Sequence, residues 1–147
     1  RHLFFLFSRD EEEYHIFLEL VSSKAVFYGK TFNIIRFEFP EMRDMRSVPF
    51  SNKIKFKTVN FLKKNLNPVI KEIVALQAMD NGAVNAVRIS GKTFFSDKSK
   101  FENSTSYDFP TILPISPIVV KKGETINLKI SYTMCEGPST LKYKIIK

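Results

Sequence analysis

The sequence predicts an all-β domain, an antiparallel β-sandwich of the jelly-roll kind with roughly eight to ten short strands. Apolar and polar residues alternate through Phe32–Phe39, Thr125–Thr133 and Thr140–Ile146. Alternation with a period of two is typical of a strand that has one buried face and one wet face. Residues that favour turns separate these segments, as expected for short strands joined by tight connections.

The first expected strand is Tyr14–Leu20, in which Ile16, Leu18 and Leu20 fall on one side. The turn before it would be Ser8–Glu13. A helical start is the alternative, because Ser8 and Glu11 fit a capping box and acidic residues favour a helix N-terminus. A short apolar run, Ala25–Tyr28, then ends at Gly29.

Phe32–Phe39 is predicted as a clear strand that stops at Pro40, because proline interrupts a ladder. Residues 1–40 form either an N-terminal arm or the first strands, and Glu41–Asn52 is a polar connection. In the next strand, Lys53–Phe61, the apolar phase slips by one residue, which predicts a β-bulge near Thr58.

Asn67–Gly82 fits two structures. As one helix over 67–80, it has Asn67 as N-cap, Pro68 at the first position and Gly82 beyond the end. As two strands, it has Asn81-Gly82, a strong hairpin signal, before a second strand at Ala83–Ser90.

Gly91–Ile115 is expected to be a long loop, because it has little periodicity and two prolines. Loops of this length are often functional. The loop is rich in aromatic residues, which need something to pack on. We therefore predict that it contacts a protein partner through Phe94, Phe95, Phe101, Tyr107 and Phe109.

In the C-terminal part, the sequence predicts a strand at Ile118–Val120, a tight turn at Lys121–Glu124 and a strand at Thr125–Thr133. Gly123 suits the turn because glycine readily takes positive φ. Alternation places Ile126, Leu128 and Ile130 in the core. Thr140–Ile146 forms the last strand.

Composition suits one domain covering residues 1–147, with 44% hydrophobic residues and 15 Phe. No apolar run approaches the roughly 20 residues that span a bilayer. Because the first residue is Arg1, we expect a fragment or a processed product. The net charge of +8 has two interpretations: solvated lysines that protect sheet edges, or a surface for nucleic acid or an acidic partner.

The chain has few of the residues that enzymes use for catalysis, metal binding or phosphate binding. The chain has two His, one Cys and five Gly, and it contains no zinc-binding or nucleophile motif. Ser90–Thr93 resembles only the end of a phosphate loop, since the glycine that such a loop needs at position 86 is Ala86. We therefore expect no enzymatic activity, no metal and no cofactor.

The function predicted from this pattern is that of a structural or assembly protein. Its partners would be copies of itself or other subunits of a larger particle, such as a virion capsid, decoration or fibre component, because jelly rolls often serve there. The first alternative is an accessory module of a surface or secreted protein that binds carbohydrate or peptide through Asn103, Tyr107 and Phe109. The second is a basic nucleic-acid-binding protein.

Overall fold

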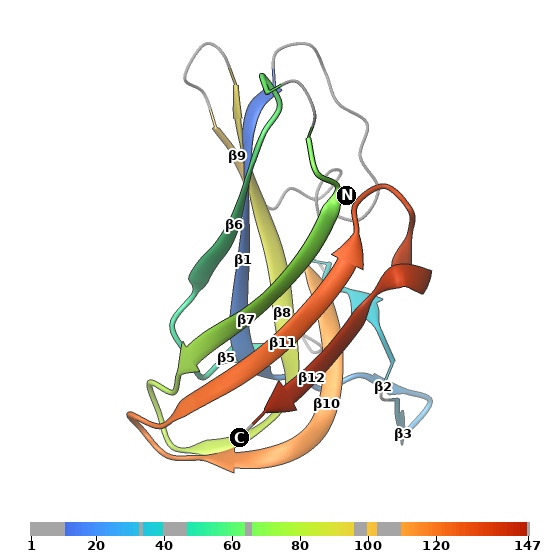
Figure 1. The fold of residues 1–147 in the computed structure, drawn as a ribbon. Coiled ribbons are helices and arrows are strands. Elements are labelled where there is room, and N and C mark those ends of the chain that lie inside the picture. Colours follow the sequence, from blue (N-terminus) through green and yellow to red (C-terminus); the bar gives the residue numbers. More distant parts are fainter. Residues whose placement is uncertain are drawn as a thin grey trace.

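The computed structural model describes residues 11–32, 34–39, 47–63, 66–95, 100–102 and 110–146. Its β-strands form two antiparallel sheets that face each other, and a small two-stranded ribbon lies beside them (Figure 1). The strands are β1 Glu11–Ser22, β2 Val26–Phe27, β3 Lys30–Thr31, β4 Arg36–Phe37, β5 Val48–Pro49, β6 Ile54–Asn60, β7 Val69–Gln77, β8 Gly82–Phe95, β9 Lys100–Glu102, β10 Thr111–Val120, β11 Thr125–Thr133 and β12 Lys142–Ile146. The predicted all-β, sandwich-like fold is therefore confirmed.

The larger sheet has seven strands in the order β4-β10-β8-β1-β5, with β6 also paired to β1 and β9 to β8. The smaller sheet has the order β12-β11-β7, and β2 pairs with β3. A jelly roll distributes eight strands over two Greek keys, so this arrangement gives the jelly-roll assignment no support. Within the described residues, no helix has the length and hydrophobicity that a membrane crossing requires.

One hydrophobic core fills the space between the two sheets. Alternate residues of β1 and β11 supply much of it, and Ile126, Leu128 and Ile130 are fully buried as predicted. The other fully buried large side chains are Tyr14, Ile16, Leu18, Leu20, Ile70, Leu76, Ile89, Leu113 and Tyr132. Since β1 lies in the middle of the larger sheet, residues 11–22 form a strand of the core and not a separate arm.

The segment from Asn67 to Gly82 is neither a helix nor half of a hairpin. Val69–Gln77 is strand β7, which pairs with β11, whereas β8 pairs with β1 and β10. The helix predicted over 67–80 is wrong because alternation buries Ile70, Val74 and Leu76 against the larger sheet. The connection through Asp80 and Asn81 contains a bend, and it carries the chain from β7 in one sheet to β8 in the other.

A second crossing, from β10 to β11, runs beside the first, and the two turns are joined by hydrogen bonds. The Lys122 amide donates to Asn81 Oδ1 over 2.8 Å, and the Gly123 amide donates to the Ala78 carbonyl over 2.8 Å. Gly123 has a φ of 89°, as the predicted turn requires. Gly82 leaves room for Phe50, whose Cε1 would lie 2.4 Å from a Cβ at that position. These contacts fix the lower corner of the sandwich in Figure 1.

Three further predictions differ in detail from the structure. The bulge in β6 is present, but the register with β1 shifts at Phe56 and not at Thr58. Of Phe32–Phe39 only β4 is strand, because it pairs with β10 over just two residues. The predicted long loop at Gly91–Ile115 is partly strand, since β8 extends to Phe95, β9 follows and β10 begins at Thr111.

Candidate functional site

The outward face of the seven-stranded sheet carries a small second apolar cluster of Val21, Ala86 and Ile112. The chain leaves this sheet after β1 and returns as β4, and we call residues 23–39 the excursion.

The side chain of Asn85 fixes the first residue of the excursion, Ser23, to the sheet. Asn85 Oδ1 accepts from the Ser23 amide, and Asn85 Nδ2 donates to the Ser23 carbonyl, both over 2.7 Å. The amide side chain thus continues the β1–β8 ladder beyond its last backbone pair.

At the middle of the excursion, β2 and β3 form a tight hairpin that projects sideways from the sandwich (Figure 1). Tyr28 and Gly29 at its tip have φ of 50° and 73°. Two consecutive positive φ values define the turn type that best fits a two-residue hairpin. Glycine adopts this conformation without strain, whereas a bulky residue such as Tyr28 does so rarely. The Tyr28 side chain is fully exposed.

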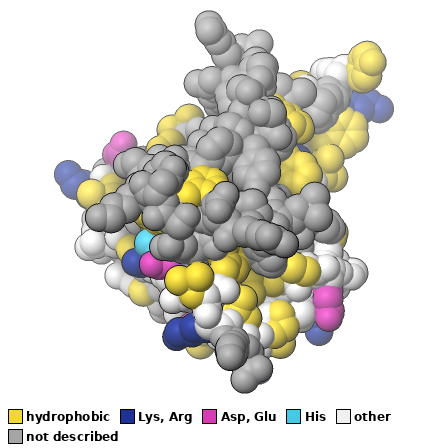
Figure 2. Space-filling view, turned by 90° about the horizontal axis from the view of Figure 1, so that it is seen from above, with side chains coloured by type: hydrophobic (Ala, Val, Ile, Leu, Met, Phe, Trp, Pro, Cys, Tyr) yellow, Lys and Arg dark blue, Asp and Glu magenta, His cyan; other side chains and the backbone are white. Residues whose placement is uncertain are grey.

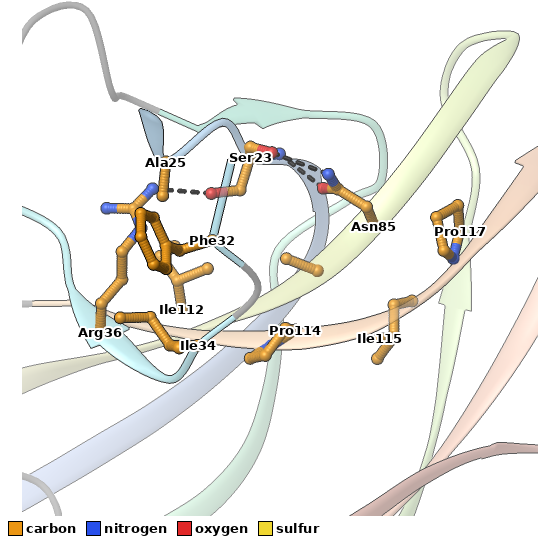
Figure 3. A pocket seen from close by; sticks show the side chains of 11 residues that line it. Ser23, Ala25, Phe32, Ile34, Arg36, Asn85, Ile112, Pro114, Ile115 and Pro117 are labelled. Carbon is orange, nitrogen blue, oxygen red and sulfur yellow. Dashed lines mark hydrogen bonds between the residues drawn. The ribbon is translucent and has the colours of Figure 1, made fainter. Parts of the chain in front are cut away.

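A cleft of about 210 Å³ lies between the excursion and β10. Figure 3 shows Phe32 and Arg36 on one side, and Pro114, Ile115 and Pro117 along β10 on the other. Two of the large apolar side chains that line it, Phe32 and Ile34, are exposed. Exposed apolar side chains that gather at a recess mark interaction sites more often than scattered residues do.

A buried charge network attaches the end of the excursion to the sheet. Arg88 forms ion pairs with Glu19 and with Glu38, the latter over 2.9 Å. The Ser47 amide and hydroxyl also donate to the Glu38 carboxylate. Burial alone would raise the pKa of Glu38, but the Ser47 hydrogen bonds and the Arg88 charge outweigh it and lower that pKa. The carboxylate is therefore held ionised.

Among the described residues that line the cleft, Arg36 is the single ionisable one. Its guanidinium Nη2 donates to Ser23 Oγ over 2.7 Å. Burial lowers the pKa of Arg36, and the charge of Glu38 partly offsets this effect. Among the described residues, no group of three His, Cys, Asp or Glu side chains is placed to hold a metal ion. The described lining of the cleft, which is mostly apolar, suits an apolar side chain.

The predicted partner-contacting residues lie elsewhere. Phe94 and Phe95 are half-buried at the end of β8, and the Phe94 ring lies 4.5 Å from that of His15. Phe101 is in β9, with its side chain outside the description, and Tyr107, Phe109 and Asn103 lie outside the described residues. Figure 2 shows that hydrophobic and charged side chains are interspersed at this end. Contact of these residues with a partner stays a prediction.

Sequence reasoning did not single out Tyr28, Phe32 or Asn85. The alternation after Phe32 predicts a strand with a buried face, although the structure leaves Ile35 and Phe37 exposed and Phe39 half-buried. A local signal was present in Tyr28-Gly29, a two-residue turn between the short runs that became β2 and β3. The contact of Asn85 with Ser23 spans 62 residues, so no local pattern predicts it.

The sequence matches no protein-family model and no curated protein. Among solved structures, the fold is similar to a chain of the Trypanosoma brucei PRMT1 enzyme-prozyme heterotetrameric complex with AdoHcy, with a TM-score of 0.59 and 12% identity. The match covers 92% of this chain and 56% of that chain. At this identity the likeness shows the fold alone.

This likeness corrects the predicted function. The expectation of a virion capsid, decoration or fibre subunit rested on the frequency of jelly rolls in such particles. The solved chain reported above belongs to the PRMT1 enzyme-prozyme complex, so the fold comparison gives the virion expectation no support. The accessory-module and nucleic-acid alternatives rested on the same general features of composition and gain nothing from the comparison.

Proposed function

We propose that this chain is a non-catalytic, protein-binding β-domain of an oligomeric enzyme, and that its partner is a second copy of the chain. The observation that carries the proposal is Tyr28, which is fully exposed at the tip of a projecting hairpin and has positive φ. Strained backbone in an exposed apolar residue costs stability and is found preferentially where a function needs it.

The position of the hairpin beside the cleft supports a symmetric contact. In a two-fold dimer, the same patch is used twice, so a projecting part must meet a recess on the same patch. Tyr28 of one copy would enter the cleft of the other, against Phe32 and Pro117, and the reverse contact would follow by symmetry. A buried aromatic ring is among the strongest contributors to an interface.

Two further observations favour this assignment. Arg36, the single ionisable residue among the described ones that line the cleft, would donate a hydrogen bond to the Tyr28 hydroxyl of a partner. The solved chain of similar fold comes from a complex of four chains and is longer than this one, since the match covers 56% of it. A domain that joins subunits while the chemistry resides elsewhere agrees with both observations.

Light scattering after size-exclusion chromatography tests the proposal. The purified chain is expected to elute at twice the mass of one chain, and Tyr28→Ser is expected to elute as a monomer. Ile73→Ser is the matched control, because it removes an exposed apolar side chain from the other sheet and should leave the dimer intact. A monomeric parent chain, or a Tyr28→Ser variant that still dimerises, would show the proposal to be wrong.

A further inference from the structure

The outward face of the three-stranded sheet is strongly basic. Lys71 on β7, Lys129 on β11, and Lys142 and Lys144 on β12 all point away from the core and line a shallow hollow of about 380 Å³. Lys129 and Lys144 are direct cross-strand partners. Like charges in this position destabilise a sheet.

No acidic residue compensates these lysines from within the sheet. Among the three strands, Glu72 is the single acidic residue. Its position in the alternation of β7 puts its side chain on the inward face of the sheet, opposite to the lysines. Its carboxylate is paired with Lys57 of β6 over 3.7 Å. The face therefore presents positive charge that the described part of the domain does not neutralise, and it will attract an anionic partner.

A second feature lies on the other side of β12. Between β12 and β10 is a largely apolar groove of about 550 Å³, lined by Pro114, Ile115, Ser116, Ile118, Tyr143, Lys144 and Ile145. Lys144 borders both this groove and the hollow of lysines. Among the described strands, β12 pairs with β11 only, so it is an edge of its sheet. Strand β12 thus has a free edge with lysines on one face and an apolar groove on the other.

We infer that β12 is a docking edge for an extended peptide in which acidic and apolar residues alternate. Such a peptide adds to a sheet edge through backbone hydrogen bonds, and its side chains point alternately to the two faces. Acidic side chains would meet Lys142 and Lys144, while the apolar ones between them would enter the groove beside Tyr143 and Ile145. Along β12, Lys142 and Lys144 alternate with Tyr143 and Ile145, so the two surfaces have the same period of two as the side chains of the peptide.

Nucleic acid fits this surface less well. Single strands bind through aromatic rings that stack on bases, next to basic side chains. The aromatic residue of β12 is Tyr143, whose hydroxyl donates to the Pro114 carbonyl over 2.7 Å. Tyr143 pairs across the sheet with buried Ile130, so its ring is on the inward face, although the residue also borders the lysine hollow. The inference does not depend on the proposed dimer, because the hairpin and β12 are separate surfaces.

The test uses the whole chain and a fluorescein-labelled, end-capped peptide of about eight residues in which Glu and Val alternate. Fluorescence anisotropy should show binding that weakens with salt. The same peptide with alternate backbone nitrogens methylated keeps its charge but loses edge donors, and it should bind at least about tenfold more weakly. A peptide of the same composition without the alternation should also bind more weakly.

Protein variants supply the second arm. Lys142→Glu combined with Lys144→Glu should weaken binding of the alternating peptide by about tenfold or more. Lys121→Glu combined with Lys122→Glu changes the same charge in an exposed turn and is the control. Equal binding of the methylated peptide, equal loss in both variants, or displacement of the peptide by a short DNA strand at lower concentration would each overturn the inference.

Discussion

The guanidinium of Arg88 donates a hydrogen bond of 2.9 Å to the carboxylate of Glu38, which lies 50 residues earlier in the chain. Arg88 also pairs with Glu19 on the neighbouring strand β1. One cation thus pairs with two largely buried carboxylates, and Ser47 donates to the remaining oxygen of Glu38. This arrangement fixes the end of the excursion against the sheet.

Replacement of Arg88 by methionine should destabilise the domain severely. Methionine keeps an unbranched apolar chain in place of the arginine stem, but Glu19 and Glu38 are left buried without a counter-charge, and breaking such a pair costs about 3–5 kcal/mol. Chemical denaturation measures the loss. Lys55→Met removes an exposed cation and is the control. A loss below about 1 kcal/mol for Arg88→Met would contradict the structural role of the network.

Glu38 should make the free energy of unfolding depend on pH in the acidic range. Its pKa is lowered in the folded protein, so the unfolded chain takes up a proton first as the pH falls. The stabilisation is complete above the ordinary carboxyl pKa of about 4.3 and is lost as the pH falls through the lower folded value. Glu38→Gln should therefore show a flatter stability profile below about pH 5 than the parent. Parallel profiles for parent and variant, with exposed Glu136→Gln as reference, would exclude this contribution.

Truncation of Leu128 to alanine should cost about 2–5 kcal/mol, because the side chain is fully buried between the sheets. The free energy of unfolding in urea is the measurement. Leu62→Ala removes the same atoms from an exposed turn and should change stability by less than about 0.5 kcal/mol. Similar losses in the two variants would mean that the position of β11 in the core is wrong.

Tyr132→Phe should leave the domain as stable or stabilise it by about 1 kcal/mol. The Tyr132 hydroxyl is buried, and no described group forms a hydrogen bond with it. Burial also raises the pKa of Tyr132, so its phenol should resist ionisation in an alkaline absorbance titration. Tyr143→Phe is the matched control, since it removes a hydroxyl that donates to Pro114 and should lose about 1 kcal/mol. A larger loss for Tyr132→Phe than for Tyr143→Phe would show that its hydroxyl is satisfied in solution.

The strands that alternate cleanly could be predicted because burial on one face is a local property of the sequence. Ile126, Leu128 and Ile130 are the clearest case. The pairing of strands is not local. Asn81-Gly82 predicts a break between two strands, but such a break serves a hairpin or a crossing between sheets, and only the pairing of β7 with β11 decides between them.

The candidate site was beyond sequence reasoning for the same reason. The excursion is held by Asn85 and Arg88, whose partners Ser23 and Glu38 lie 62 and 50 residues away. Phe32 and Phe37 look like core residues by type, and their exposure depends on how far β4 remains paired with β10. Polar contacts between residues so far apart in the sequence produce no periodic pattern from which they could be predicted.

The two crossings between the sheets determine the order in which strands can pair while the chain is being synthesised. Strand β7 finds its partner only when β11, which ends at Thr133, has left the ribosome. Until then a Val- and Ile-rich segment has no sheet to join, and unpaired strands of this kind are prone to associate with other chains. Early folding is thus confined to β1, β6 and β8, and the closing of the second sheet depends on the last part of the chain to be made.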